Sequence, residues 1–140
     1  MINHENTPTG GVSNFKINFN STSKLWNTSS SKAVSVVTAD VVKFFKNCSG
    51  TVTPWGTILS GEEARDTGDI NSDGYQDVGW LVECDPVANS ICKYNGGNKQ
   101  QKLWAMGRMA HENACIAKDN KMMSIKGGKP SLYIANIKAL

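Results

Sequence analysis

Residues 47–63 hold the densest set of chemically capable side chains in the sequence. The segment reads NCSGTVTPWGTILSGEE and offers a thiol at Cys48 and adjacent carboxylates at Glu62 and Glu63. A thiolate in a loop serves as a nucleophile or as a soft metal ligand. Neighbouring strand residues point to opposite faces, so a single metal would take only one glutamate unless the chain bends at Gly61. The alternative for Cys48 is a small, buried hydrophobic side chain, and the alternative for the two glutamates is a solvent-exposed acidic end of a strand.

A second polar segment, residues 106–112, reads MGRMAHE and supplies Arg108, His111 and Glu112. A guanidinium suits a phosphate or carboxylate group. The His-Glu pair is not the HExxH motif, and no helical pattern surrounds it. We expect this segment and residues 47–63 to face one polar, metal-binding site, with Arg108 and His111 as its catalytic side chains.

Residues 69–77 read DINSDGYQD and alternate oxygen-bearing side chains around a central glycine. Tight loops that bind calcium place their oxygen ligands in this arrangement. The segment is not an EF-hand, because Trp80 stands where the bidentate glutamate belongs, and it looks more like the calcium loops of integrin-type propeller repeats. We expect four side chains to bind calcium: Asp69, Asn71, Asp73 and Asp77. The alternative is a simple turn made by aspartate, asparagine and glycine.

The four cysteines are Cys48, Cys84, Cys92 and Cys115, and they lack the CxxC spacing of zinc modules. Cys84 and Cys92 flank a turn-like stretch, DPVANSI. They are predicted either to close a small disulfide in an oxidising compartment or to stay reduced.

The bulk composition is that of a folded domain. The chain has 140 residues, 39% hydrophobic and 19% charged, and a net charge of +3. These values exclude a disordered tail, and the scattered lysines and arginines do not indicate nucleic-acid binding. No apolar run approaches the roughly 20 residues of a membrane span, and the polar N-terminus lacks the order of a signal peptide.

The elements that must position these side chains read as short strands separated by turn signals. Alternating, β-branched and apolar runs predict strands at residues 15–19, 55–60, 78–84, 101–106, 113–117, 122–126 and 132–137. Residues 20–32 read as a loop or an exposed hairpin. Residues 33–45 form a β-branched, apolar run, of which residues 41–45 could also be a short helical turn. No segment carries a sustained helical pattern with caps, so the sequence predicts an all-β fold of antiparallel meander sheets.

Together these segments resemble the PhoX-type alkaline phosphatase family. The family pattern is close to N-C-A-G-G, then T-P-W-G-T, then E-E, and residues 47–50, 53–57 and 62–63 are similar to it. Residues 79–86 are similar to the next strand of the family, residues 106–112 to its G-R-F-x-H-E segment, and residues 3–5 to an upstream N-H-E stretch. The order and approximate spacing agree from Met1 to about Ala117.

The resemblance implies a secreted or periplasmic β-propeller phosphatase whose site holds iron and calcium ions. By motif, the loop cysteine Cys48 would be an iron ligand, and the metal-binding glutamates would be Glu62 or Glu63, and Glu112. Propeller blades take roughly 40–50 residues each. We therefore expect residues 1–140 to form a single domain of about three blades, a fragment of such a propeller.

The function implied is metal-dependent hydrolysis of phosphate monoesters, by this chain or by a longer protein of which it is a fragment. The partner expected is a phosphate monoester substrate, with no nucleic acid and no membrane span, and open sheet edges would allow self-association. The alternative is a non-catalytic calcium-binding propeller-like module, which rests on residues 69–77.

Overall fold

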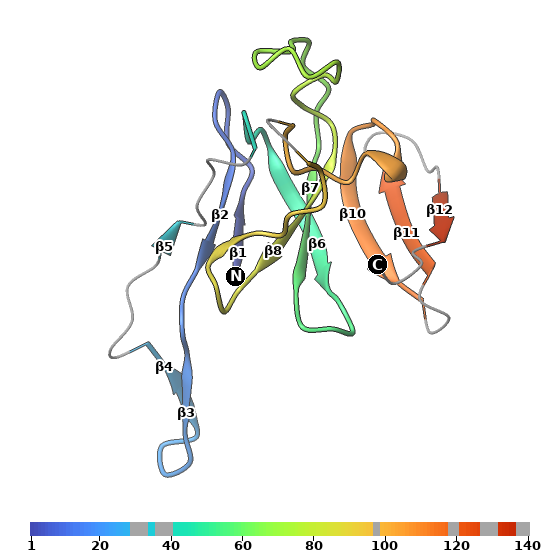
Figure 1. Ribbon diagram of the computed structural model, residues 1–140. Helices are drawn as coiled ribbons and strands as arrows, with labels where there is room; N and C mark the ends of the chain where they lie inside the picture. The colour runs from blue at the N-terminus through green and yellow to red at the C-terminus, as the bar shows by residue number, and fades with distance from the viewer. Residues whose placement is uncertain (29–33, 36–40, 97–98, 118–120, 127–131, 137–140) are drawn as a thin grey trace.

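The computed structural model shows an all-β protein with antiparallel pairing throughout the strands it describes (Figure 1). It describes residues 1–28, 34–35, 41–96, 99–117, 121–126 and 132–136. The all-β prediction is confirmed, since one short 3-10 helix, η1 (Trp104–Met106), is the only helix in these residues. None of the helices described could span a membrane.

The central sheet has four strands in the order β6-β7-β8-β9, which are β6 (Asn47–Val52), β7 (Ile58–Glu62), β8 (Leu81–Asp85) and β9 (Ser90–Ile91). The TPWG segment turns the chain from β6 to β7, with the Thr53 N–H donating to the Thr57 carbonyl at 2.9 Å. Asp85 closes the β8–β9 turn by accepting the backbone N–H groups of Val87 and Ala88. Each strand therefore pairs with the next one along the chain, and the sheet is a meander.

Two further sheets flank the central one (Figure 1). On one side β1 (Ile2–His4) pairs with β2 (Gly11–Asn14), which pairs with β5 (Val34–Ser35). On the other side β10 (His111–Ile116) pairs with β11 (Lys121–Lys126), which pairs with β12 (Leu132–Asn136). Three antiparallel sheets that follow one another along the chain, with no closed barrel among the described residues, are consistent with part of a propeller.

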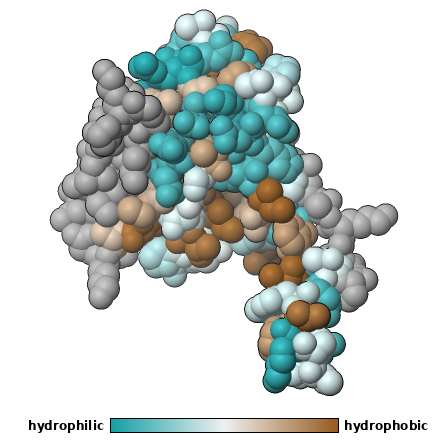
Figure 2. Space-filling model, turned by 180° about the vertical axis from the view of Figure 1, so that it is seen from behind, coloured by the Kyte–Doolittle hydropathy of each residue, from teal (hydrophilic) through white to brown (hydrophobic). Residues whose placement is uncertain are grey.

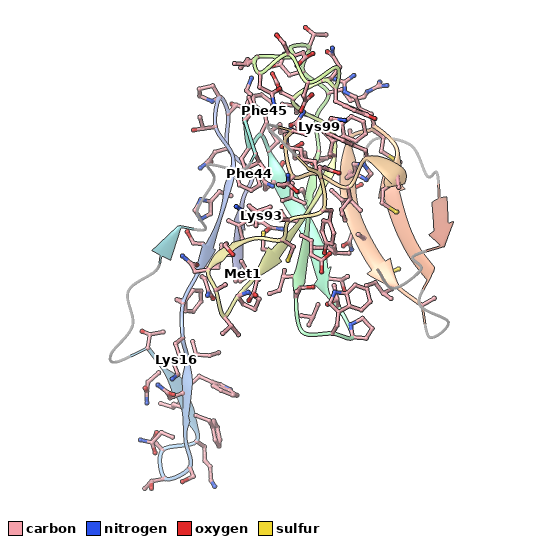
Figure 3. All side chains as sticks on the ribbon, viewed as in Figure 1. Met1, Lys16, Phe44, Phe45, Lys93 and Lys99 are labelled. Carbon is pink, nitrogen blue, oxygen red and sulfur yellow. The ribbon has the colours of Figure 1, made fainter. Side chains whose placement is uncertain are left out.

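Alternation along β8 divides the core into two clusters, because successive side chains of a strand point to opposite faces. Val82 and Cys84 pack towards β1 and β2 with Val12, Val41, Phe44 and Ile91, and Met1 packs against this cluster (Figure 3). Leu81 points the other way and packs with Leu59, Met106 and Ala114. The central sheet is therefore buried on both faces.

A hairpin of β3 (Asn18–Asn20) and β4 (Leu25–Asn27) extends away from the sheets (Figure 1). Phe19 and Trp26 face each other across it, with ring centroids 5.2 Å apart. Both rings are more than half exposed, and apolar side chains show on the surface of this arm (Figure 2). The exposed-hairpin alternative for the segment after residue 20 is thus the one observed.

Several predicted strands differ from the observed ones. Residues 101–106 form no strand: Gln101 and Lys102 are buried in side-chain hydrogen bonds, and the chain then enters η1. Strand β8 begins only at Leu81, because Gly79 adopts a left-handed φ of 101°. The runs at 15–19 and 55–60 are displaced to β3 and β7. In the 33–45 run, residues 34–35 form β5 and residues 41–45 form neither a strand nor a helical turn. Residues 33 and 36–40, the turn at 127–130 and residue 137 lie outside the described residues.

Candidate metal centre

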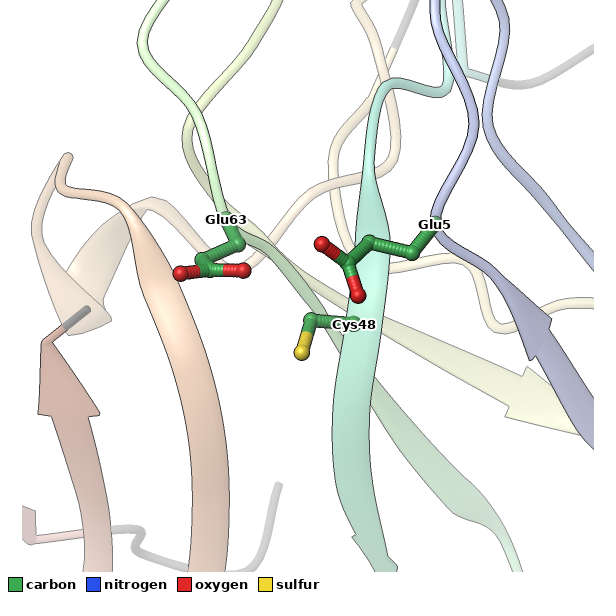
Figure 4. Close-up of side chains that lie close together, drawn as sticks. All are labelled: Glu5, Cys48 and Glu63. Carbon is green, nitrogen blue, oxygen red and sulfur yellow. The ribbon is translucent and has the colours of Figure 1, made fainter.

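Three side chains capable of binding a metal converge at the upper edge of the central sheet (Figure 4). One ligand atom each from Glu5, Cys48 and Glu63 lies within 4.8 Å of the other two. In the part of the chain that the structure describes, no other group of three His, Cys, Asp or Glu side chains converges in this way. Two carboxylates and one thiol form a donor set for a metal cation that accepts both oxygen and sulfur.

Each of the three residues comes from a different element. Glu5 directly follows β1, Cys48 is the second residue of β6, and Glu63 directly follows β7. Glu5 is exposed, whereas Cys48 and Glu63 are half-buried. The group is therefore fixed from within the protein and open to solvent on the Glu5 side.

An irregularity in β6 determines where Cys48 lies. Asn47 pairs with Glu62 and Gly50 with Ser60, so two residues of β6 stand opposite the single residue Gly61 of β7. Such a bulge bends the strand and re-aims the side chains within it. Cys48 is one of the two bulged residues, which places its thiol at the strand edge.

Two glycines are required here by close approach of the backbone. A Cβ atom on Gly50 would lie 1.8 Å from the Leu59 carbonyl oxygen. A Cβ atom on Gly61 would lie 2.7 Å from the carbonyl oxygen of His111, the first residue of β10. Glycine at these positions lets β6 bulge against β7 and lets β10 pack closely over β7.

Backbone hydrogen bonds hold the three segments together. The Lys46 carbonyl accepts the Glu63 N–H at 2.9 Å, and the Lys46 N–H donates to the Asn6 carbonyl at 3.2 Å. The Asn3 side-chain amide donates to the Cys48 carbonyl at 3.2 Å. The segment after β1, the start of β6 and the end of β7 are thus tied at the point where the three side chains meet.

The electrostatics of the group favour a bound cation. Burial, followed by the nearby charges of Glu5 and Glu63, raises the pKa of the Cys48 thiol to about 11. Three acidic groups this close repel one another when ionised. A cation would reverse that effect and favour the thiolate, because metal binding displaces the thiol proton.

Glu62, the other member of the adjacent pair, points into the protein. Its side chain is completely buried, and its two carboxylate oxygens lie 2.8 and 3.0 Å from Lys102 Nζ. It also accepts the backbone N–H groups of Gly79 and Trp80. Burial raises the pKa of Glu62 and lowers that of Lys102, and the ion pair between them opposes both shifts. The carboxylate is occupied by internal donors, so the structure brings only Glu63 of the pair to the metal group.

In the second predicted segment, residues 106–112, Arg108 and His111 form hydrogen bonds with backbone carbonyls of the protein. Arg108 Nε donates to the Val78 carbonyl at 2.8 Å, and its Nη2 donates to the Asp66 carbonyl. His111 is completely buried, and its Nε2 lies 3.0 Å from the Gly107 carbonyl, so the neutral ring donates there. Burial lowers the pKa of His111 to about 4. Glu112 is exposed, and neither it nor His111 joins the Glu5 group.

The acidic loop of residues 69–77 is closed by its own hydrogen bonds. Asp69 accepts the backbone N–H groups of Asp73 and Gly74 at 2.9 and 3.0 Å, and Asp77 accepts that of Ile70 at 3.1 Å. Asp73 accepts the Asn71 amide at 3.1 Å. The three aspartates do not form a converging group, so the loop is ordered in this structure without their meeting at one point.

Cys84 and Cys92 are free thiols in the structure, so of the two alternatives it shows the reduced one. Beside them lies a buried carboxylate that the sequence did not single out, Glu83, which accepts Trp55 Nε1 at 2.7 Å and the hydroxyl groups of Thr57 and Tyr94. These bonds fix the TPWG turn to β8.

The residue of the centre that sequence reasoning missed is Glu5. Its signal is its place in the Asn3-His4-Glu5 stretch, which resembles the family but predicts no ligand role by itself. Lys102, the partner of Glu62, had no signal, because a lysine in a polar stretch normally reads as exposed.

Comparison with protein families finds a match over most of the chain. The model of the family described as "Alkaline phosphatase PhoX" matches residues 3–127, which include all three converging side chains. No match was found among curated proteins or among solved structures. Since the family model covers most of the 140 residues, the chain belongs to the PhoX alkaline phosphatase family.

Proposed function

We propose that Glu5, Cys48 and Glu63 are metal ligands of a phosphate monoester hydrolase. The observation that carries the proposal is the convergence of their ligand atoms within 4.8 Å, from three separate elements, in a chain of the PhoX alkaline phosphatase family. Groups of like charge are not gathered for stability, because they repel one another. A bound cation accounts for their proximity.

The donor set bears on the identity of the metal. A thiolate beside two carboxylates suits iron, which binds sulfur as well as oxygen, whereas calcium takes oxygen ligands alone. We therefore propose iron at the Cys48 group and calcium at neighbouring oxygen donors. Such ions would supply positive charge that polarises the phosphate ester and stabilises the departing oxygen.

The residues of this chain would hold and orient that charge. The Glu62–Lys102 pair fixes the end of β7 from which Glu63 projects, and the bulge in β6 fixes Cys48. Preorganised geometry of this kind is what electrostatic catalysis requires. The exposed Glu5 side gives a substrate access from solvent. Secretion or a periplasmic location would follow from the family.

Phosphate binding tests the proposal. The chain is titrated with inorganic phosphate, the product of the reaction, before and after loading with iron and calcium, and hydrolysis of 4-nitrophenyl phosphate is measured on the same samples. We expect phosphate binding only in the metal-loaded protein, and its loss in Glu63→Gln together with any turnover.

The matched control is Asp85→Asn, outside the group, where the asparagine side-chain oxygen can accept the same two N–H groups of the β8–β9 turn; it should behave as wild type. Phosphate binding that ignores the metals, or metal and phosphate binding that survives in Glu63→Gln, would show that this group is not the site.

A second proposal concerns the loop at residues 69–77, as a calcium-binding site of a non-catalytic module. The observation that favours it is the loop's ordered turn around Gly74, with Asp69 and Asp73 accepting backbone N–H groups within it. Calcium would have to draw the side-chain oxygens together. Calcium binding that persists in Cys48→Ser and disappears in Asp73→Ala would support this function.

A further inference from the structure

One cation stands beside the acidic group, and it belongs to the residue whose backbone joins the three segments. Lys46 Nζ lies 3.9 Å from Glu5 Oε1. Two further lysine ion pairs join Lys43 to Asp66 and Lys102 to Glu62, and neither includes a member of the group. Lys46 is thus a cation paired with a member of the metal centre.

The backbone of Lys46 is held in an uncommon conformation. Its φ is 47°, in the left-handed region, which costs energy for a residue other than glycine, asparagine or aspartate. The conformation is maintained by its N–H bond to Asn6 and its carbonyl bond from Glu63. These hydrogen bonds therefore hold Lys46 in a backbone conformation that glycine, asparagine or aspartate would adopt at a lower cost.

The side chain, in contrast, is not locked. Its distance of 3.9 Å from Glu5 is at the outer limit of an ion pair and too long for a hydrogen bond. The Lys46 side chain is 34% exposed and that of Glu5 49% exposed, so solvent screens the pair and its stabilisation is small. Turning the Lys46 ammonium group towards a different anion would therefore cost little free energy.

A metal at the centre would favour turning the Lys46 ammonium group away from Glu5. A cation bound by Glu5 takes up the carboxylate charge that attracts Lys46 and repels the ammonium group. A phosphate dianion bound by the same cation would be the nearest remaining negative charge, and lysine binds phosphate as a mobile point charge.

We propose that Lys46 is the substrate-binding cation of this site, with its ammonium group donating to a phosphate oxygen when metal occupies the Glu5 group. The inference rests on the proposed function, because it requires metal at Glu5, Cys48 and Glu63. It assigns Lys46 two partners in turn, Glu5 without metal and phosphate with metal.

The test uses Co²⁺ alone and then inorganic phosphate. Cobalt binding to the whole chain is followed through its thiolate absorption, and phosphate is then titrated into the cobalt-saturated protein. The test variant is Lys46→Asn, because asparagine adopts a left-handed φ readily and carries no charge. Lys46→Met serves if Lys46→Asn does not fold, and Lys46→Arg retains the charge.

The matched control is Lys24→Met. Lys24 also has a left-handed φ, of 58°, but stands between β3 and β4 on the exposed arm. This variant removes one lysine from the same backbone conformation without touching the centre.

We expect Lys46→Asn to bind Co²⁺ as tightly as wild type or up to about tenfold more tightly, because a positive charge next to the metal is removed. We expect its phosphate affinity to fall about tenfold, as for the loss of one charge-assisted hydrogen bond. Lys46→Arg and Lys24→Met should remain within about twofold of wild type in both titrations.

The possible failures separate the two proposals. If the wild type does not bind Co²⁺, or binds it without a thiolate band, the proposed function falls and the inference falls with it. If the cobalt-loaded wild type binds phosphate and Lys46→Asn binds it equally well, the inference about Lys46 is wrong and the proposed function stands.

Discussion

Replacing Lys102 with methionine would remove the cation that neutralises Glu62 inside the protein. Both side chains are completely buried. Lys102 Nζ also donates to the Lys43 carbonyl at 2.8 Å and to the Asp77 carbonyl. Methionine of similar length would leave the Glu62 carboxylate with two backbone N–H donors and would leave those two carbonyls without this partner.

Breaking a buried ion pair by removing one partner costs about 3–5 kcal/mol, because an uncompensated charge remains. The lost bonds to two carbonyls place the expected loss of unfolding free energy for Lys102→Met at the upper end of that range. Replacing both partners, in Glu62→Gln with Lys102→Met, should recover about half of the loss, because no buried charge then remains. For a domain of marginal stability, Lys102→Met alone would remove a large part of the free energy of unfolding.

Urea unfolding followed by tryptophan fluorescence measures these losses as a shift in midpoint at constant slope. Lys99→Met is the matched control, since Lys99 is exposed over the Trp104 ring, and it should cost under about 1 kcal/mol. A loss below about 1 kcal/mol in Lys102→Met would refute the view that Glu62 has an internal, structural role.

Three further predictions follow from single features. His111 is buried in its neutral form with a pKa lowered from 6.5 to about 4, so the unfolded state takes up a proton first as the pH falls. Wild type should therefore lose about 2 kcal/mol of unfolding free energy between pH 7 and 5 relative to His111→Gln. Equal dependence on pH in urea unfolding of the two proteins would contradict this. If residues 69–77 bind calcium, a hundredfold excess over Kd should stabilise the chain by about 2.7 kcal/mol, and Asp73→Ala should abolish the shift; identical thermal melts of both proteins with and without calcium would leave only a turn. The exposed Phe19–Trp26 pair should promote self-association, so Trp26→Lys should lower the apparent mass in sedimentation at high concentration; a monomer in both proteins would contradict it.

The fold class could be predicted because short strands leave a local record. β-branched and apolar runs bounded by glycine, proline and aspartate signal strands and turns through effects that act within a few residues. The strand predicted at residues 101–106 is wrong because the prediction used these local effects alone. The backbone and side-chain groups of these residues are satisfied by distant partners such as Glu62, which local propensity cannot reveal.

The candidate site was predictable only where one strand carried the information. Alternation indicated that Glu62 and Glu63 face opposite ways, and they do, but not which of them meets Cys48. That depends on the bulge opposite Gly61 and on Lys102, whose positions are set by tertiary packing. Glu5 joins Cys48 through the placement of β1 beside β6, a contact between segments far apart in the chain.

The central claim, that Glu5, Cys48 and Glu63 bind one metal, is tested most directly by X-ray absorption at the iron edge. The iron-loaded chain should show one sulfur ligand among oxygen ligands, together with a thiolate-to-metal absorption band. Cys48→Ser should lose both features, whereas Cys92→Ser, at a half-buried thiol beside β9, should keep them. Iron with no sulfur ligand in wild type, or a sulfur ligand that persists in Cys48→Ser, would contradict the claim.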